Sequence, residues 1–148
     1  MAKIGVFVGT VYGNALAVAE EAQQILGRQG HEVKTFEDAT LAQWQEYRQQ
    51  VVLVITSTTG QGELPDNIRP LYAELNDKLG HQSDLRYGMI VLGDRSYDTF
   101  CGGGRIFDEL LQEQGAKRIG DILLIDAIEV VEPEAFAQDW IEHWGALL

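Results

Sequence analysis

The run Val51-Val52-Leu53-Val54-Ile55, followed by the loop Thr56-Ser57-Thr58-Thr59-Gly60-Gln61-Gly62-Glu63-Leu64-Pro65-Asp66-Asn67, decides the fold class. Five consecutive apolar residues, four of them β-branched, are typical of a strand buried on both faces of a parallel sheet. The following segment is polar, contains two glycines, and reaches a proline and an aspartate that are typical of the start of a helix. A buried strand that leads through such a loop into a helix is the repeating unit of an α/β protein.

The same alternation of strand and helix extends in both directions. Further strands are predicted at Ile4–Val8, Glu32–Phe36, Tyr87–Leu92 and Ile122–Ile125. Helices are predicted from apolar residues at helical spacing: Ala15, Val18, Ala19, Ala22, Ile25 and Leu26; Leu41 and Trp44; Ile68, Leu71, Tyr72, Leu75 and Leu79; Ile106, Phe107, Leu110 and Leu111; and Phe136, Trp140, Trp144 and Leu147 after Pro133. We expect one α/β domain over residues 1–148, with helices on both faces of a five-stranded parallel sheet.

Composition excludes several classes of protein. The 148 residues include 11 Lys and Arg against 23 Asp and Glu, a net charge of −12, which disfavours binding to nucleic acid. Cys101 is the only cysteine, so no internal disulfide or cysteine metal cluster is possible, and the three histidines follow no ligand pattern. The lack of such ligands predicts no metal site. We find no signal peptide and no apolar run long enough to span a membrane, and therefore expect a cytoplasmic protein.

The loop Gly9–Ala15 joins the first strand to the first helix and is a candidate phosphate site. The first N–H groups of a helix lack partners and carry a partial positive charge, which favours an anion. Thr10 and Asn14 add side-chain donors, and Gly13 allows close approach of the backbone. The loop matches neither the Walker A pattern nor the dinucleotide glycine pattern, and an ordinary strand-to-helix turn is the alternative.

Two further loops follow the third and fourth strands, at the edge where ligands of open parallel sheets bind. The two glycines of Thr56–Asn67 allow the backbone to approach a flat ligand, although a polar turn with a helix cap would look similar. In Leu92–Gly104, the aromatic Tyr97 lies in a polar loop, where it is a candidate stacking wall; packing on the sheet edge is its alternative.

Taken together, Thr10–Ala15, Ser57–Asn67 and Leu92–Phe100 make the sequence resemble flavodoxins along its whole length. The resemblance is strongest to short-chain, stand-alone flavodoxins of the MioC/YqcA type, and it extends to the FMN domains of diflavin reductases. It implies a three-layer sandwich with strand order 2-1-3-4-5. It also implies one non-covalently bound FMN.

The resemblance assigns the cofactor's parts to the three loops. Thr10 to Ala15 would hold the phosphate, Thr58 to Gly62 would cover one side of the flavin ring, and Leu92 to Phe100 would hold its pyrimidine edge, with Tyr97 stacked on it. The implied cofactor-binding residues are Thr10, Val11, Tyr12, Gly13, Asn14, Ala15, Ser57, Thr58, Thr59, Gly60, Gln61, Gly62, Leu92, Gly93, Asp94, Tyr97, Phe100 and Cys101. Tyr12, Ala15 and Thr59 depart from the residues that are common in the family at these positions.

The function implied by the resemblance is electron transfer without a substrate of its own. An NADP-dependent flavodoxin or ferredoxin reductase would be the donor, acceptor enzymes with basic surfaces would take the electrons, and the protein would be a monomer. The acidic net charge suits docking onto such partners. Two alternatives stay open: a small flavin-dependent reductase on the same fold, and a binding module that has lost FMN.

Overall fold

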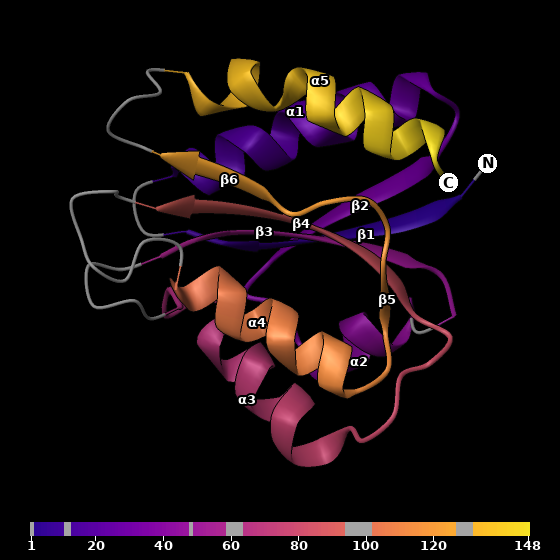
Figure 1. The fold of residues 1–148 in the computed structure, drawn as a ribbon, viewed down its shortest axis with the longest axis vertical. Helices are drawn as coiled ribbons and strands as arrows, with labels where there is room; N and C mark the ends of the chain where they lie inside the picture. Colours follow the sequence, from indigo (N-terminus) through magenta and orange to yellow (C-terminus); the bar gives the residue numbers. More distant parts are fainter. Residues whose placement is uncertain (1, 11–12, 48, 59–63, 94–101, 127–131) are drawn as a thin grey trace.

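A parallel sheet forms the middle layer of the protein (Figure 1). The computed structural model describes residues 2–10, 13–47, 49–58, 64–93, 102–126 and 132–148. The strands are β1 (Lys3–Gly9), β2 (Glu32–Glu37), β3 (Val51–Ser57), β4 (Arg86–Gly93), β5 (Lys117–Arg118) and β6 (Leu123–Asp126). They follow the order β2-β1-β3-β4, with β5 and β6 both beside β4, and every pairing is parallel. The implied order 2-1-3-4-5 is therefore confirmed.

The fifth strand differs from the prediction of one straight run over Ile122–Ile125. Arg118 pairs with Tyr87, and the next pair is Leu123 with Ile90. Between these two pairs β4 advances by three residues, whereas the fifth strand advances by five. The two extra residues lie around Gly120, whose φ of 73° is in the left-handed region. Only the apolar half of this strand has a clear pattern in the sequence, because β5 is a polar pair of residues, Lys117 and Arg118.

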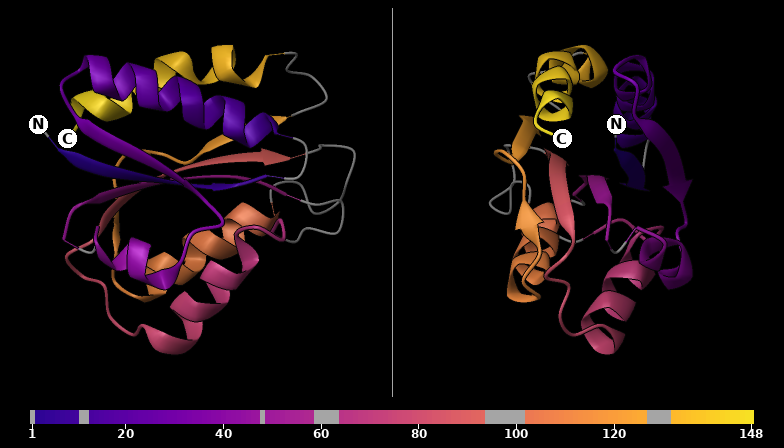
Figure 2. Two further views of the ribbon diagram at one scale, coloured as in Figure 1. Left: turned by 180° about the vertical axis from the view of Figure 1, so that it is seen from behind. Right: turned by 90° about the vertical axis from the view of Figure 1, so that its right-hand side faces the viewer.

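Helices cover both faces of the sheet (Figures 1 and 2). On one face lie α1 (Asn14–Arg28) and α5 (Pro133–Ala146), and on the other lie α2 (Leu41–Gln45), α3 (Arg69–Lys78) and α4 (Gly102–Glu113). Val51, Leu53 and Ile55 pack in the core with α1 and α5, whereas Val52 and Val54 pack in the core with α2, α3 and α4. The continuous apolar run is thus buried on both sides, as predicted. In the described ranges no helix combines the length and the apolar character that crossing a bilayer requires.

The buried faces of the helices agree with the predictions for α1 but not for α5. In α1 the buried residues are Ala15, Val18, Ala19, Ala22, Ile25 and Leu26, all of which were predicted. The apolar spacing predicted that Phe136 and Leu147 are buried, but Phe136 of α5 and Leu147, which follows α5, are 52% and 61% exposed. Ile106, predicted on the apolar side of α4, is 43% exposed. The α5 helix instead buries Ala137, Ile141 and Trp144. The reason is close packing of helices: a Cβ at Gly145 would collide with Gln29 and Leu26, so the small residues of α5 face α1.

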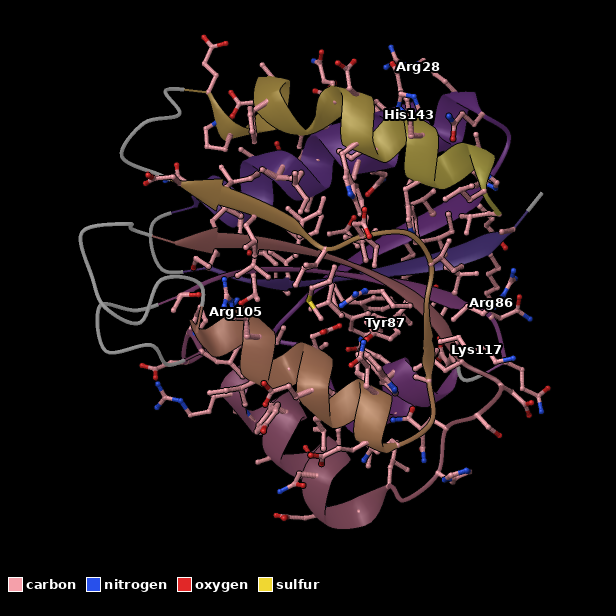
Figure 3. All side chains as sticks on the ribbon, in the orientation of Figure 1. Arg28, Arg86, Tyr87, Arg105, Lys117 and His143 are labelled. Atoms are coloured by element: carbon pink, nitrogen blue, oxygen red, sulfur yellow. The ribbon has the colours of Figure 1, made fainter. Side chains whose placement is uncertain are left out.

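A buried polar cluster fixes β5 beside β4. The hydroxyl of Tyr87 donates to Oδ1 of Asp108 at 2.5 Å, and Nη1 of Arg118 lies 2.8 Å from Oδ2 of the same carboxylate. In Figure 3, the labels Tyr87 and Lys117 mark the two strands that this cluster holds together, β4 and β5. Burial, and next the hydrogen bond to Asp108, raises the pKa of Tyr87 above its ordinary value. The hydrogen bond from Tyr87 to Asp108 therefore stabilises the fold while the phenol is neutral.

Replacement of Tyr87 by Phe is expected to change the dependence of stability on pH. A raised folded pKa gives stability that is complete below the unfolded pKa of about 10 and is lost as the pH rises above it. Tyr87→Phe should lower stability by about 1 kcal/mol near neutral pH, through the lost hydrogen bond, and should flatten the loss between pH 9 and about 11. Urea unfolding across that range measures both effects; an unchanged alkaline slope would contradict them.

A second test concerns Gly88, where the indole of Trp144 lies directly on β4. A Cβ at this position would stand 2.5 Å from Nε1 and Cε2 of Trp144. We expect Gly88→Ala to destabilise the protein by about 1–3 kcal/mol, because the α5 helix would have to shift. Gly27→Ala is the matched control, since its Cβ would meet nothing within 4 Å; it should be neutral or stabilising by up to about 1 kcal/mol. Thermal unfolding would compare the two, and equal effects would contradict the prediction.

Candidate functional site

The carboxyl ends of the central strands lie side by side at one edge of the sheet. Gly9 pairs with Thr56, Ser57 with Leu92, and Gly93 with Asp126. This is the left-hand edge of the sheet in Figure 1. β2 and β3 lie on opposite sides of β1, so the order in which the chain adds strands to the sheet changes direction between β1 and β3. Ligands of open parallel sheets bind at such a switch point. The first, third and fourth strands thus bring the starts of the three predicted loops together.

The N-terminus of α1 is built as an anion site. Gly13 is the N-cap residue, with a φ of 88°; it has no side chain to cap the helix, and the first turn has no acidic residue. The N–H of Gly13 donates to Oγ1 of Thr10 at 2.8 Å. This bond fixes the Thr10 hydroxyl next to the helix end and directs its hydrogen elsewhere, while Asn14 is exposed. N–H and hydroxyl groups therefore provide the donors for an anion at this position.

Asn67 connects this loop to the loop that follows β3. Its Oδ1 accepts from the N–H of Thr10 at 2.9 Å, and its Nδ2 donates to the carbonyl of Val8 at 3.3 Å. The hydroxyl of Ser57 lies 3.5 Å from the carbonyl of Gly9. One amide side chain thus holds the backbone on both sides of Gly9 in place. The sequence analysis placed Asn67 in a polar loop without assigning it a role, since the pairing joins residues 57 positions apart.

Gly9 allows the two loops to approach so closely. A Cβ at Gly9 would lie 2.5 Å from Cγ2 of Ile68 and 2.6 Å from Oγ1 of Thr56. Any side chain here would push β1 away from the segment that carries Asn67. The glycine is therefore a packing requirement of the site rather than a turn residue.

Thr58 carries a buried polar atom that no other described residue pairs with. Its Oγ1 is buried and has no hydrogen-bond partner among the described residues. Because buried polar groups are nearly always paired, such an atom beside an uncapped helix end fits a ligand with polar edges. Among the described residues, the donors of Thr10, Asn14 and Thr58 thus suit a molecule with both a phosphate and a polar ring.

Other predicted site residues contribute differently or lie outside the described residues. Ala15 and Leu92 are 0% and 1% exposed and pack with α1 and α5, so only their backbone is available to a ligand. Asp126, 6% exposed, ends β6 next to Gly93 and was not predicted, although it is the one charged residue that closes the apolar strand. The following predicted residues lie outside the described residues: Val11, Tyr12, Thr59, Gly60, Gln61, Gly62, Asp94, Tyr97, Phe100 and Cys101.

Figure 3 labels basic side chains at both ends of the sheet and, with Arg28 and His143, in the layer of α1 and α5. Arg86 and Lys117 pair in register at the amino edge, far from the site, whereas Arg105 stands in the first turns of α4, at the carboxyl edge. Near the site, Arg69 is engaged with Asp66 at 3.1 Å and with the carbonyl of Leu64 at 2.9 Å. The hydrogen bonds described at the start of α1, from Gly13 to Thr10 and from Thr10 to Asn67, join uncharged groups.

Comparison with known proteins identifies the family. The flavodoxin family model matches residues 6–140. The chain is 64% identical to Flavodoxin YqcA of Pectobacterium carotovorum subsp. carotovorum over 148 residues, which cover 100% of this chain and 98% of that protein. It is 35% identical to Protein MioC of Escherichia coli (strain K12), with 100% and 99% covered.

The solved structures agree. A cysteine-to-alanine mutant of flavodoxin from Pseudomonas aeruginosa superposes with a TM-score of 0.92 at 42% identity, covering 99% of this chain and 98% of that one. A flavodoxin from Streptococcus pneumonia TIGR4 gives a TM-score of 0.83 at 26% identity, with 99% and 100% covered. The chain therefore belongs to the flavodoxin family, as a stand-alone flavoprotein of the MioC/YqcA type that binds one FMN non-covalently.

Proposed function

We propose that this flavodoxin holds FMN at the carboxyl edge of the sheet, with the phosphate at the N-terminus of α1. The observation that carries the proposal is the pair of loops tied by Asn67 beside an uncapped helix end. Thr10 and Asn14 donate to the phosphate, Gly13 allows the backbone to approach it, and Val11, Tyr12 and Ala15 of the same loop complete the phosphate site. Ser57 and Thr58 begin the segment that covers the ring, which continues through Thr59, Gly60, Gln61 and Gly62. Leu92, Gly93, Asp94, Tyr97, Phe100 and Cys101 hold the pyrimidine edge.

The bound FMN supplies reversible one-electron chemistry, and the residues of the chain supply its binding and surroundings. The backbone at Leu92 and Gly93 is buried and fixes the floor of the site. The Thr58 hydroxyl gains a polar partner on binding. Of the loop acids that could oppose a negative charge on the ring, Asp66 contributes little, because it is 92% exposed and pairs with Arg69.

The proposal extends to the partners. An NADP-dependent flavodoxin or ferredoxin reductase donates the electrons, and acceptor enzymes with basic surfaces take them, which the net charge of −12 supports. We also propose that residues 1–148 act as one domain, as a monomer in the cytoplasm, with no substrate turnover of its own. Oxidation of NADPH by the FMN-loaded protein without a reductase would contradict the carrier role and favour a small flavin-dependent reductase.

The first test compares FMN with riboflavin. Riboflavin lacks the phosphate, so it leaves the N–H groups at the end of α1 unpaired, at a cost of about 1–3 kcal/mol for each buried group. We expect FMN to bind at least about tenfold more tightly than riboflavin in titrations of the apoprotein. Equal dissociation constants would place the phosphate elsewhere, and a protein that takes up neither flavin would favour a module that has lost its cofactor.

The second test concerns Asn67 as a positioning residue. In Asn67→Asp the donor to the carbonyl of Val8 is replaced by a carboxylate oxygen, and a negative charge is added next to the phosphate loop. We expect the dissociation constant of FMN to rise about tenfold or more. Because the effect acts through the phosphate loop, the dissociation constant of riboflavin should rise much less.

Asn76→Asp on the exposed side of α3 is the matched control, since it adds the same charge away from the site. It should leave both dissociation constants nearly unchanged. If Asn67→Asp weakens FMN and riboflavin equally, Asn67 supports only the fold. If Asn76→Asp has the same effect as Asn67→Asp, net charge is the cause.

A further inference from the structure

The α5 helix and the residue that follows it present a stripe of apolar side chains to solvent. Phe136 and Leu147 are 52% and 61% exposed, and the partly buried Trp140 lies between them on the same side of the helix. Residues 136, 140 and 147 share one side at helical spacing and extend over about 16 Å of helix. Of the three large hydrophobic side chains that are exposed among the described residues, two therefore lie on this stripe.

A hollow of about 200 Å³ lies beside the stripe. It is lined by Gly120, Asp121, Trp140, His143, Trp144 and Leu147. It sits where α5 meets the break between β5 and β6, and Figure 2 (right) shows both on the same side of the molecule, opposite α1 and β2. The extra residues of the split fifth strand thus form part of the hollow.

The aromatic wall of the hollow is rigid. The rings of Trp140 and Trp144 are stacked, with centroids 5.9 Å apart and an interplanar angle of 10°. Nε1 of Trp140 donates to the carbonyl of Asp121 at 3.1 Å, which ties the helix to the sheet edge. Nδ1 of His143 donates to the carbonyl of Asp139 at 2.7 Å. A partner that docks here pays little entropy to order these side chains.

The segment that carries the stripe is acidic, although Arg28 of α1 lies beside His143 of α5 (Figure 3). From Ile119 to Leu148 the sequence has no Lys or Arg but seven acidic residues: Asp121, Asp126, Glu129, Glu132, Glu134, Asp139 and Glu142. Asp121 is exposed and lines the hollow itself, and Asp139 is exposed one turn after Phe136. An apolar centre with an acidic border fits an apolar side chain surrounded by Lys or Arg. A second copy of the same surface would bring like charges together, and an anionic lipid surface would be repelled as well.

We propose that the stripe and hollow of α5, formed by Phe136, Trp140, Leu147, Gly120 and Asp121, are a docking surface for a basic partner protein that inserts an apolar side chain beside Trp140. The surface runs along α5 from Phe136, in the first turn of the helix near the carboxyl edge, to Leu147, at the end of the molecule where both termini lie (Figure 1). The hollow lies beside the C-terminal half of the helix, so a partner side chain in the hollow is away from the carboxyl edge. The inference goes beyond the proposed electron transfer and does not depend on where FMN binds.

The test uses the FMN-loaded protein and a fluorescein-labelled helical peptide of about 14 residues with Leu along one face and Lys along the other. A peptide of the same composition, scrambled so that the Leu residues form no stripe, controls for attraction by charge alone. Fluorescence anisotropy gives the dissociation constants. We expect the striped peptide to bind at least about tenfold more tightly than the scrambled one.

Single substitutions then locate the surface. Leu147→Ser and Phe136→Ser should each weaken the striped peptide several-fold, and Asp121→Asn should weaken it and reduce its dependence on salt. Ile106→Ser removes a similarly exposed apolar side chain from α4, and Asp77→Asn removes an exposed carboxylate from α3; both should change binding less than twofold. Thermal unfolding checks that each variant is folded.

Four outcomes would overturn the proposal. The scrambled peptide could bind as tightly as the striped one, or neither could bind. The Ile106 and Leu147 variants could have equal effects. Sedimentation could show a dimer that Leu147→Ser dissociates, in which case the stripe is an interface between copies of this chain.

Discussion

The burial of β3 on both faces is the constraint on which the rest of the structure depends. Val51, Val52, Leu53, Val54 and Ile55 are each at most 1% exposed. A strand with no face for water needs a strand on each side and a layer of helices above and below. The pairing with β1 and β4, and the placement of α1 and α5 opposite α2, α3 and α4, meet that requirement. Because strands joined through helices run parallel, their carboxyl ends collect at one edge of the sheet.

The cofactor site follows from that edge, but its geometry depends on a few contacts within it. Gly9 lets the first strand lie against Ile68 and Thr56, and Asn67 then holds the backbone at Val8 and Thr10. The start of α1 is unfavourable for the isolated helix, since its N-cap residue, Gly13, has no side chain to pair with the first N–H groups. The same holds for the buried hydroxyl of Thr58. A protein keeps such unpaired groups where a ligand pairs them, and FMN has the phosphate and the polar ring edge that these groups require.

On the α5 side of the molecule, close packing between helices leaves large apolar side chains exposed to water. Contact with α1 needs small residues, so Ala137 and Gly145 face inward and the larger Phe136 and Leu147 are left in water. Trp144 is the exception, since it is accommodated over Gly88 of β4. Trp140 and the two extra residues near Gly120 then create a hollow at the sheet edge. The acidic side chains of this segment favour solubility of the protein despite the exposed stripe, and they favour a basic partner over an acidic one.

The sequence by itself determined the class of fold, the sheet's position between two helical layers, and the three loops that we propose hold the cofactor. These features follow from local periodicity, from the buried run at β3, and from loop residues whose conformational freedom and hydrogen-bonding groups are properties of the residue types. Only the tertiary structure decided that Asn67 ties loops 57 residues apart, that the fifth strand is split, and which residues of α5 meet solvent. The physical reason is the same in each case: these features depend on how closely two distant elements approach. That distance is set by side chains such as those of Ile68, Gln29 and Trp144, which belong to other elements and leave no mark on the local pattern.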